Sequence, residues 1–193
     1  MSTMHRTATT VYWTVDSPIG ELLLAGDGER LERLHMQGGK RPAAIGPDWE
    51  RAEEPFADLC GQLDEYFAGE RREFDLELDP HGTEFERRVW DALRQIPYGE
   101  TEAYGELAER IGHPGRARAV GAANGANPIA VVIPCHRVIG ADGKLTGYAG
   151  GLERKRLLLE LESPPGGGGH GPKPTPGAVE PAYSQLGLDS PAA

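Results

Sequence analysis

Residues 104–125 read YGELAERIGHPGRARAVGAANG, two short helix-forming segments separated by the turn Gly112-His113-Pro114-Gly115. Apolar side chains recur at helical spacing ahead of the turn, at Tyr104, Leu107, Ala108 and Ile111. Small residues from Ala117 to Ala123 follow the turn and are closed by Gly125, which predicts a second short helix. Two short helices joined by a glycine-containing turn have the outline of a helix-turn-helix. The outline also arises by chance in sequences rich in small residues, so alone it assigns no function.

The segments on both sides of this stretch extend it into a mostly helical domain over residues 81–162. Thr83 and Glu86 have the spacing of a capping box, and one apolar face follows, formed by Phe85, Val89, Trp90 and Leu93. The sequence Ile96-Pro97-Tyr98-Gly99 ends that helix. Residues 129–133 are predicted to form a short apolar strand before Pro134. Residues 152–161 predict a last helix, whose leucines available for packing are Leu152, Leu157, Leu158 and Leu161.

Residues 1–80 have the pattern of a small α/β domain. Three strands are predicted at 10–15, 21–25 and 31–35, with a hairpin signal at Gly26-Asp27-Gly28. Apolar residues then repeat at helical spacing up to Gly69, at Phe56, Leu59, Leu63 and Phe67. Phe74, Leu76 and Leu78 alternate as in a half-buried strand. Residues 163–193 are rich in proline and glycine, and we expect that tail to be disordered.

The charge is distributed unevenly along the chain. The net charge is −10, and residues 1–80 contribute 8 basic and 17 acidic groups, whereas residues 81–162 contain 11 of each. Arginines and a lysine near the motifs of the second domain predict a local basic face: Arg116, Arg118, Arg137, Arg154, Lys155 and Arg156. We therefore expect modest affinity for a polyanion, with a weak dependence on salt.

Several classes of protein are excluded by what the chain lacks. It has no run of about 18 apolar residues, so no membrane span is expected. Residues 1–10 are polar and lack the apolar core of a secretory signal. Its two cysteines, Cys60 and Cys135, form neither a disulfide framework nor a Cys-x-x-Cys pair, so we predict no metal site and a cytoplasmic protein.

The stretch Ile133-Pro134-Cys135-His136-Arg137-Val138 carries the candidate chemistry. A cysteine attacks as its thiolate, and a histidine supported by a carboxylate can remove the thiol proton. A tight turn after Pro134 would bring His136 near the sulfur, directly or through one water. Taken alone, the pair is a weak signal, because a lone cysteine is usually a small apolar side chain. Cys60, on the apolar face of the predicted 56–67 helix, is an example of such packing.

This stretch resembles the active-site signature of the O6-alkylguanine-DNA alkyltransferase family, Pro-Cys-His-Arg-Val. Matching residues recur in order over about residues 82–162, at Gly82-Thr83, Phe85, Val89-Trp90, Ile96-Pro97-Tyr98-Gly99, Tyr104, Leu107-Ala108, Arg118-Ala119-Val120-Gly121, Asn127-Pro128, Gly143, Gly147-Tyr148 and Gly150-Gly151-Leu152. The resemblance implies an α+β chain of two domains. A ribonuclease-H-like α/β domain (1–80) would precede an α-rich, winged-helix-like domain (81–162) that binds DNA and carries the catalytic residues.

The resemblance also implies a reaction and its catalytic residues. The alkyl group of O6-alkylguanine in DNA would move irreversibly to Cys135, once per molecule and without a cofactor. His136 would deprotonate Cys135 through a water, and Glu162 would orient His136, with Glu160 as the rival carboxylate. Asn127 would tie the active-site turn to the helix-turn-helix. Tyr104 would contact the target nucleotide and its 3′ phosphate and donate a proton toward the guanine.

The partner implied by the resemblance is double-stranded DNA, bound through the minor groove with the damaged base flipped out. Arg118 would fill the hole left by that base, and the face around it would be Ala119, Gly121, Ala122 and Arg137. The alkyl and guanine pocket would be formed by Val138, Tyr148, Ala149 and Ala130. Ala130 stands where some members of the family have a proline, which predicts a roomier pocket.

Three other functions compete with this interpretation. A protein that senses alkylated bases without repairing them would lack the acceptor cysteine, and Cys135 is present. A thiol peptidase or acyltransferase would not explain Arg118 or the Asn127-Pro128 junction. A winged-helix regulator would need a basic recognition helix, whereas residues 117–123 are small apart from Arg118. We expect a monomer in solution; cooperativity on DNA, adduct size and activity on O4-alkylthymine are left open by the sequence.

Overall fold

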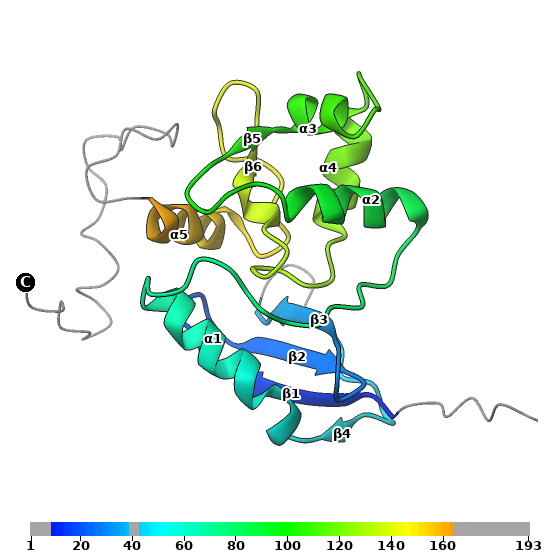
Figure 1. Ribbon diagram of the computed structural model, residues 1–193, viewed down its shortest axis with the longest axis vertical. Coiled ribbons are helices and arrows are strands. Elements are labelled where there is room, and N and C mark those ends of the chain that lie inside the picture. Colours follow the sequence, from blue (N-terminus) through cyan, green and yellow to red (C-terminus); the bar gives the residue numbers. More distant parts are fainter. Residues whose placement is uncertain (1–8, 39–42, 164–193) are drawn as a thin grey trace, which may run out of the picture.

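The computed structural model describes residues 9–38 and 43–163, which form two lobes (Figure 1). The predicted disordered tail lies, apart from Ser163, outside the described residues. The N-terminal lobe is a small sheet with one helix against it, and the C-terminal lobe is a cluster of helices. None of the helices in these ranges is long and apolar enough to cross a membrane.

The sheet of the N-terminal lobe has the strand order β3-β2-β1-β4. β1 (Val11–Val15), β2 (Leu22–Gly26) and β3 (Leu31–Met36) are antiparallel, and the short β4 (Glu50–Arg51) adds to β1 in parallel. The three predicted strands and their hairpin are confirmed, each bound shifted by one residue at most. β4 was not predicted. β2 is buried along its whole length, so the core of the lobe is centred on it.

A single helix covers this sheet. The 3-10 turn η1 (Glu54–Phe56) leads into α1 (Ala57–Phe67), and Gly69 ends the helix with φ +77°, a conformation that glycine adopts without strain. The predicted strand at 74–78 is wrong. These residues are extended, but they reach β3 only through a bridge from Leu78 to Leu31. The reason is that residues 128–130 occupy the β3 edge at Leu34, with Leu34 N 2.9 Å from Pro128 O.

The helix-turn-helix is confirmed in the C-terminal lobe as α3 (Tyr104–Arg110) and α4 (Ala117–Gly125), packed together and joined by the predicted turn. α2 (Glu84–Leu93) begins at the predicted capping box of Thr83 and Glu86. The indole of Trp90 donates to Ala123 O at 2.9 Å, which fixes α2 against α4. α5 (Leu152–Glu162) closes the lobe; it buries Leu158, but Leu152, predicted to pack, is 45% exposed.

The predicted strand at 129–133 is wrong as well, because these residues form a tight turn. Asn127 closes it from both ends: its Oδ1 accepts from Ile129 N at 3.0 Å and its Nδ2 donates to Ile133 O at 2.8 Å. Val131 has φ +71°, an uncommon conformation for a β-branched residue. The stretch is apolar because Ile129 and Ile133 are buried, and Ala130 N donates to Leu34 O in β3 at 3.0 Å. This turn contacts the N-terminal lobe through Leu34 and leads directly to Cys135.

Candidate active site

Cys135 begins η2 (Cys135–Arg137), a single 3-10 turn held between the helix-turn-helix and α5. Its carbonyl accepts from Asn124 Nδ2 at 3.2 Å, so α4 fixes its backbone. The strand β6 (Val138–Ile139) follows at once and pairs in parallel with β5 (Glu102–Ala103), directly before α3. This pairing fixes the start of the helix-turn-helix next to the cysteine turn.

The environment of the Cys135 thiol favours its protonated form. Cys135 is 5% exposed, and burial raises the pKa of the thiol above its ordinary value. The Asn127 side chain, the Lys155 ammonium and nearby backbone amides oppose that rise without cancelling it. The resting thiol is therefore protonated at neutral pH, and attack by its sulfur requires a base.

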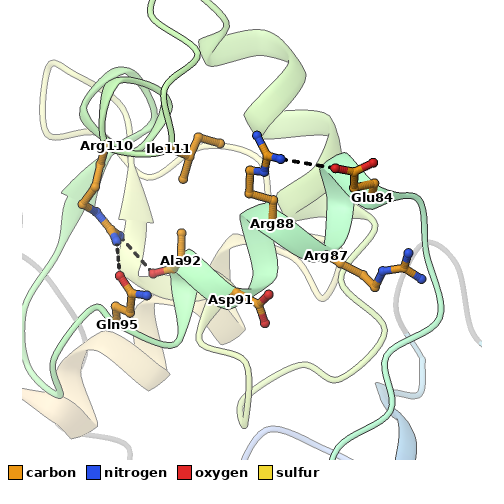
Figure 2. Close-up of a pocket in the computed structure, with 8 residues that line it drawn as sticks. All are labelled: Glu84, Arg87, Arg88, Asp91, Ala92, Gln95, Arg110 and Ile111. Carbon is orange, nitrogen blue, oxygen red and sulfur yellow. Dashed lines mark hydrogen bonds and ion pairs between the residues drawn. The ribbon is translucent and has the colours of Figure 1, made fainter.

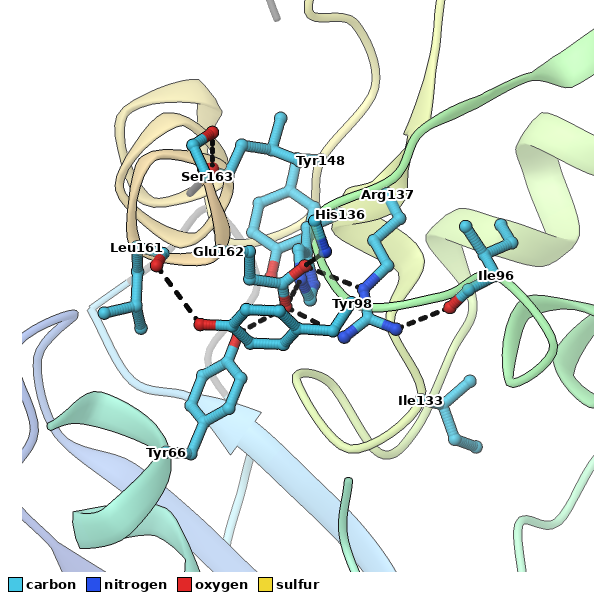
Figure 3. Close-up of polar contacts among 12 residues, drawn as sticks. Tyr66, Ile96, Tyr98, Ile133, His136, Arg137, Tyr148, Leu161, Glu162 and Ser163 are labelled. Atoms are coloured by element: carbon cyan, nitrogen blue, oxygen red, sulfur yellow. Dashed lines mark hydrogen bonds and ion pairs between the residues drawn. The ribbon is translucent and has the colours of Figure 1, made fainter. Parts of the chain in front are cut away.

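His136 is placed to be that base. Its Nε2 lies 2.9 Å from Glu162 Oε1, and both side chains are fully buried (Figure 3). Because a carboxylate accepts, Nε2 carries the proton and Nδ1 keeps its lone pair. Within residues 9–38 and 43–163, Nδ1 has no hydrogen-bond partner. Burial, together with the charges of Arg137 and Lys155, lowers the pKa of His136 although Glu162 opposes this, so the imidazole is neutral at neutral pH.

Glu162 is the charged centre of this group. Its two oxygens accept five hydrogen bonds (Figure 3), from Tyr66 Oη (2.7 Å), His136 Nε2 (2.9 Å), Arg137 Nε and Nη2 (2.8 and 2.9 Å) and Gly99 N (3.3 Å). Burial alone would raise the pKa of Glu162, but His136 and Arg137 hold it well below its usual range. Glu160 is exposed, so the carboxylate behind His136 is that of Glu162.

The structure contradicts the expected place of Arg137 on the DNA-binding face. Arg137 is 7% exposed, pairs with Glu162 through two nitrogens and donates from Nη1 to Ile96 O. All three nitrogens of the guanidinium are hydrogen-bonded inside the protein, so Arg137 is not placed to contact a phosphate at the surface. Sequence reasoning treated it as a surface charge, because arginine is rarely buried unless it is paired. Its role is to hold Glu162.

Lys155 was expected on a local basic face, and the structure contradicts this, because its side chain is buried in the site. It is 0% exposed, and its Nζ donates to Val138 O at 2.6 Å and Thr146 O at 2.7 Å. Burial lowers the pKa of Lys155 to about 8. The ammonium near Cys135 favours the thiolate and connects α5 to the strand after the cysteine. Lys155 lies between Arg154 and Arg156, and no local signal in the sequence distinguishes it from these two arginines.

Tyr104 and Tyr148 line the other side of the cysteine turn. Tyr104 begins α3, and its hydroxyl donates to Thr146 O and Gly147 O, both at 3.3 Å. Burial, with Cys135 nearby, raises the pKa of both tyrosines, so each hydroxyl stays neutral. Tyr148 donates to Met36 Sδ at 3.8 Å, across the boundary between the lobes. Of the other predicted pocket residues, Val138 and Ala130 are buried and Ala149 is exposed.

The exposed face of α4 carries the residues expected to meet DNA. Arg118 and Ala122 are exposed, and Ala119 and Gly121 are half-buried. Arg118 makes no hydrogen bond or ion pair with any residue that the structure describes. Its neighbours on the helix are small, so the surface around the arginine is low and allows another molecule to approach closely.

Two other features were tested as sites. The described residues contain no group of three or more His, Cys, Asp or Glu side chains that could hold a metal ion. A surface pocket lies between α2 and α3 (Figure 2), and it contains none of the predicted site residues. Two of its three arginines are paired, Arg88 with Glu84 at 3.3 Å and Arg110 with Glu102 at 2.7 Å.

Comparison with known families gives a match over nearly all described residues. Residues 10–80 match the ribonuclease-like domain of 6-O-methylguanine DNA methyltransferase, and residues 84–164 match its DNA-binding domain. The predicted α+β class, with a ribonuclease-like lobe before a helical DNA-binding lobe, is confirmed.

Individual relatives agree with this match. The methylated-DNA–protein-cysteine methyltransferase of Methanosarcina acetivorans is 54% identical over 151 residues, covering 78% of this chain and 97% of the relative. The protein of the same name from Mycolicibacterium paratuberculosis is 61% identical over 152 residues, covering 78% and 91%. The crystal structure of Mycobacterium tuberculosis OGT in complex with DNA is 58% identical, with a TM-score of 0.75, covering 79% of this chain and 92% of that one.

Proposed function

This chain belongs to the 6-O-methylguanine DNA methyltransferase family, and on that premise we propose that Cys135 is the residue that accepts the methyl group. As a methylated-DNA–protein-cysteine methyltransferase, it repairs O6-methylguanine in DNA. The observation that supports the assignment to Cys135 is the protonation state and orientation of the adjacent His136. His136 is neutral, its Nε2 is held by Glu162, and its Nδ1 is unpartnered among the described residues.

The first step is removal of the thiol proton. Nδ1 of His136 accepts the Cys135 proton through one water molecule, and the imidazolium that forms is stabilised by the Glu162 carboxylate. Lys155 and the Asn127 side chain stabilise the negative charge that appears on the sulfur. Glu162 stays ionised throughout, because Arg137 compensates its charge.

The second step transfers the methyl group. The thiolate attacks the methyl carbon, so the S–C bond forms while the C–O6 bond breaks and its electron pair stays on the guanine. The departing guanine takes up a proton, which we assign to the neutral hydroxyl of Tyr104. Solvent then returns a proton to Tyr104 and receives the one held by His136. No cofactor enters this sequence. A thioether sulfur is a poor leaving group for attack by water, and we assign none of the described residues around Cys135 to that step, so each molecule reacts once.

Access to the base depends on the helix-turn-helix. O6 of guanine lies on the major-groove edge of the stacked base, away from the minor groove that the helix is proposed to bind, so the base has to leave the stack at a cost of about a few kcal/mol. We assign Arg118 to the space that the base leaves, because it projects from a face of small residues on α4. The crystal structure of Mycobacterium tuberculosis OGT in complex with DNA supports DNA as the partner.

The assignment is tested by comparing the two cysteines. Wild-type protein, Cys135→Ser and Cys60→Ser are incubated with a duplex that carries one O6-methylguanine, and the cysteine peptides are analysed by mass spectrometry. We expect methyl on the Cys135 peptide in wild type and Cys60→Ser, and none in Cys135→Ser. Methylation of Cys60, or binding of the damaged duplex without methylation of wild type, would contradict the assignment, and the second result would favour a damage-sensing function.

A further inference from the structure

The hydroxyl of Tyr66 is the contribution of the N-terminal lobe to the active-site carboxylate. Tyr66 is in α1, 96 residues before Glu162, and donates to Glu162 Oε1 at 2.7 Å. The other donors to Glu162 come from the C-terminal lobe. Figure 3 shows the Tyr66 ring rising from α1 toward the carboxylate, on the side away from His136. We propose that Tyr66 is a positioning residue for methyl transfer, which sets the basicity of His136 by donating to Glu162.

Tyr66 is held too firmly to be an incidental contact. It is 0% exposed, and three aromatic rings pack around it: Phe67 and Phe74 with centroids at 5.3 Å and Tyr98 at 6.2 Å. Burial, with the Glu162 charge beside it, raises the pKa of Tyr66 well above its ordinary value. The hydroxyl therefore stays neutral and can always donate. Its position is fixed by α1 and by the aromatic rings packed around it.

The shared oxygen makes this bond relevant to chemistry. Tyr66 and His136 both donate to Oε1 of Glu162, so each competes for the same negative charge. A donor that withdraws charge from Oε1 weakens the attraction of the carboxylate for the imidazolium. Tyr66 thereby keeps His136 neutral, with its Nδ1 lone pair available, down to a lower pH than Glu162 alone would allow.

The charged groups around His136 are the same in wild type and in a Tyr66→Phe variant. Arg137 in η2 and Lys155 in α5 both lower the pKa of His136, and Glu162 at the end of α5 raises it. From the N-terminal lobe, Tyr66 is the polar group that reaches the pair. Replacing Tyr66 by phenylalanine keeps the ring, the packing and all of these charges, and removes one hydroxyl.

The proposal rests on the function proposed above, and its test is arranged so that the two can fail separately. Single-turnover methyl transfer from an O6-methylguanine duplex is measured for wild type and Tyr66→Phe between about pH 5 and 9, with protein in excess. We expect the acid limb of the Tyr66→Phe profile to move to higher pH by about half to one unit, as expected for loss of one hydrogen bond to a charged group. Near pH 8.5 the two rates should converge.

A matched control removes a different hydroxyl from the same aromatic cluster. Tyr98 Oη donates to the backbone carbonyl of Leu161 at 3.1 Å, so Tyr98→Phe should leave the acid limb in place. NMR titration of the His136 ring in the three proteins gives a readout that needs no DNA. We expect a raised His136 pKa in Tyr66→Phe only, with the proton still on Nε2.

The possible results distinguish failure of the role proposed for Tyr66 from failure of the proposed function. A Tyr66→Phe profile that is lowered by the same factor at every pH, or a His136 pKa that does not rise, would reduce Tyr66 to a packing residue and overturn the proposal. A shift of the acid limb in Tyr98→Phe equal to that in Tyr66→Phe would overturn it too. Absence of methyl transfer by wild type would instead contradict the proposed function, while the NMR titration would still decide the role of Tyr66.

Discussion

At the scale of single residues, the site brings together side chains that would each be unfavourable alone. Glu162, Arg137 and Lys155 are buried charged residues, and His136 is a buried neutral base between them. Breaking a buried ion pair by removing one partner typically costs about 3–5 kcal/mol, because the other charge is left without compensation. The carboxylate, guanidinium and imidazole therefore act as a unit, and the reactivity of Cys135 cannot be separated from their stability.

His136 gives this unit a defined response to pH. Its pKa in the folded protein is lowered by burial, whereas in the unfolded chain it returns to about 6.5. Below about pH 6.5 the unfolded state binds more protons at this residue, so the free energy of unfolding falls as pH falls. We expect His136→Gln, which keeps a donor for Glu162, to show a weaker fall between about pH 6.5 and 5 in urea denaturation.

The comparison of the two proteins isolates His136 from other titrating groups. His35 is also partly buried with a lowered pKa, but it is present in both and cancels in the difference. Glu162, whose pKa is also lowered, contributes its own loss of stability only below about pH 4.3, outside this window. Parallel stability curves for wild type and His136→Gln between pH 6.5 and 5 would mean that His136 is not held neutral in the fold.

At the scale of elements, the turn of the helix-turn-helix contains two glycines with left-handed backbone conformations, Gly112 and Gly115. Gly112 has φ +79°, and no atom lies within 4 Å of the position that a Cβ would take. Gly112→Ala should therefore lower the free energy of unfolding by about 1–2 kcal/mol, all of it from backbone strain. Thermal or urea denaturation measures the change.

Gly105, inside α3, is the matched control. It also has open space around its Cβ position, but its φ is not in the left-handed region. Gly105→Ala should stabilise the protein by roughly 0.4–1 kcal/mol, because alanine favours the helix and restricts the unfolded chain. A loss of stability in both variants would contradict this account, because backbone conformation is the property that distinguishes the two positions.

The helix α4 makes a separate prediction for DNA. Arg118→Ala should slow methyl transfer from duplex DNA by about tenfold or more, since an inserted side chain offsets part of the few kcal/mol needed to unstack a base. Transfer from the free O6-methylguanine base should change little. Arg116→Ala, an exposed arginine before the helix, should cause a smaller loss on the duplex. Equal losses on duplex and free base would place Arg118 in the chemistry and not in base flipping.

The elements also show where reasoning from sequence succeeds. Segments with local signals are as predicted: the capping box of Thr83, the hairpin at Gly26-Asp27-Gly28 and the helices of residues 104–125. The stretch 129–133 has the composition of a strand because it is buried between lobes, and periodicity cannot distinguish that origin from pairing in a sheet.

Side-chain contacts between distant parts of the chain escaped prediction for a related reason. Arg137 and Lys155 are charged, and charged side chains usually lie at the surface. Their partners, Glu162 and Val138 O, become visible only in the folded structure. Tyr66 was not among the residues singled out in the predicted helix before Gly69, and nothing in the sequence indicates its bond to Glu162. Cys135, His136 and Glu162 were identified through the resemblance, whose motif specifies them, while local patterns alone left Cys135 ambiguous.

At the scale of the whole molecule, each lobe contributes to one site. The helical lobe supplies Cys135, its proposed base and the proposed DNA-binding face, and the sheet lobe supplies Tyr66 and supports the cysteine turn through Leu34. The acidic charge is concentrated in residues 1–80, so it lies mainly on the lobe that does not carry α4. This division explains how a chain of net charge −10 can belong to a family that acts on DNA.

The central claim is that one methyl group moves from O6-methylguanine to Cys135 and stays there. Its most direct test is the intact mass of the protein, titrated with increasing amounts of a duplex that carries one O6-methylguanine, with Cys135→Ser alongside. We predict a gain of one methyl group that reaches a plateau at one per molecule, with an equal amount of guanine restored in the duplex and no gain in Cys135→Ser. Guanine restored in excess of protein, or restored without any gain in protein mass, would contradict the claim.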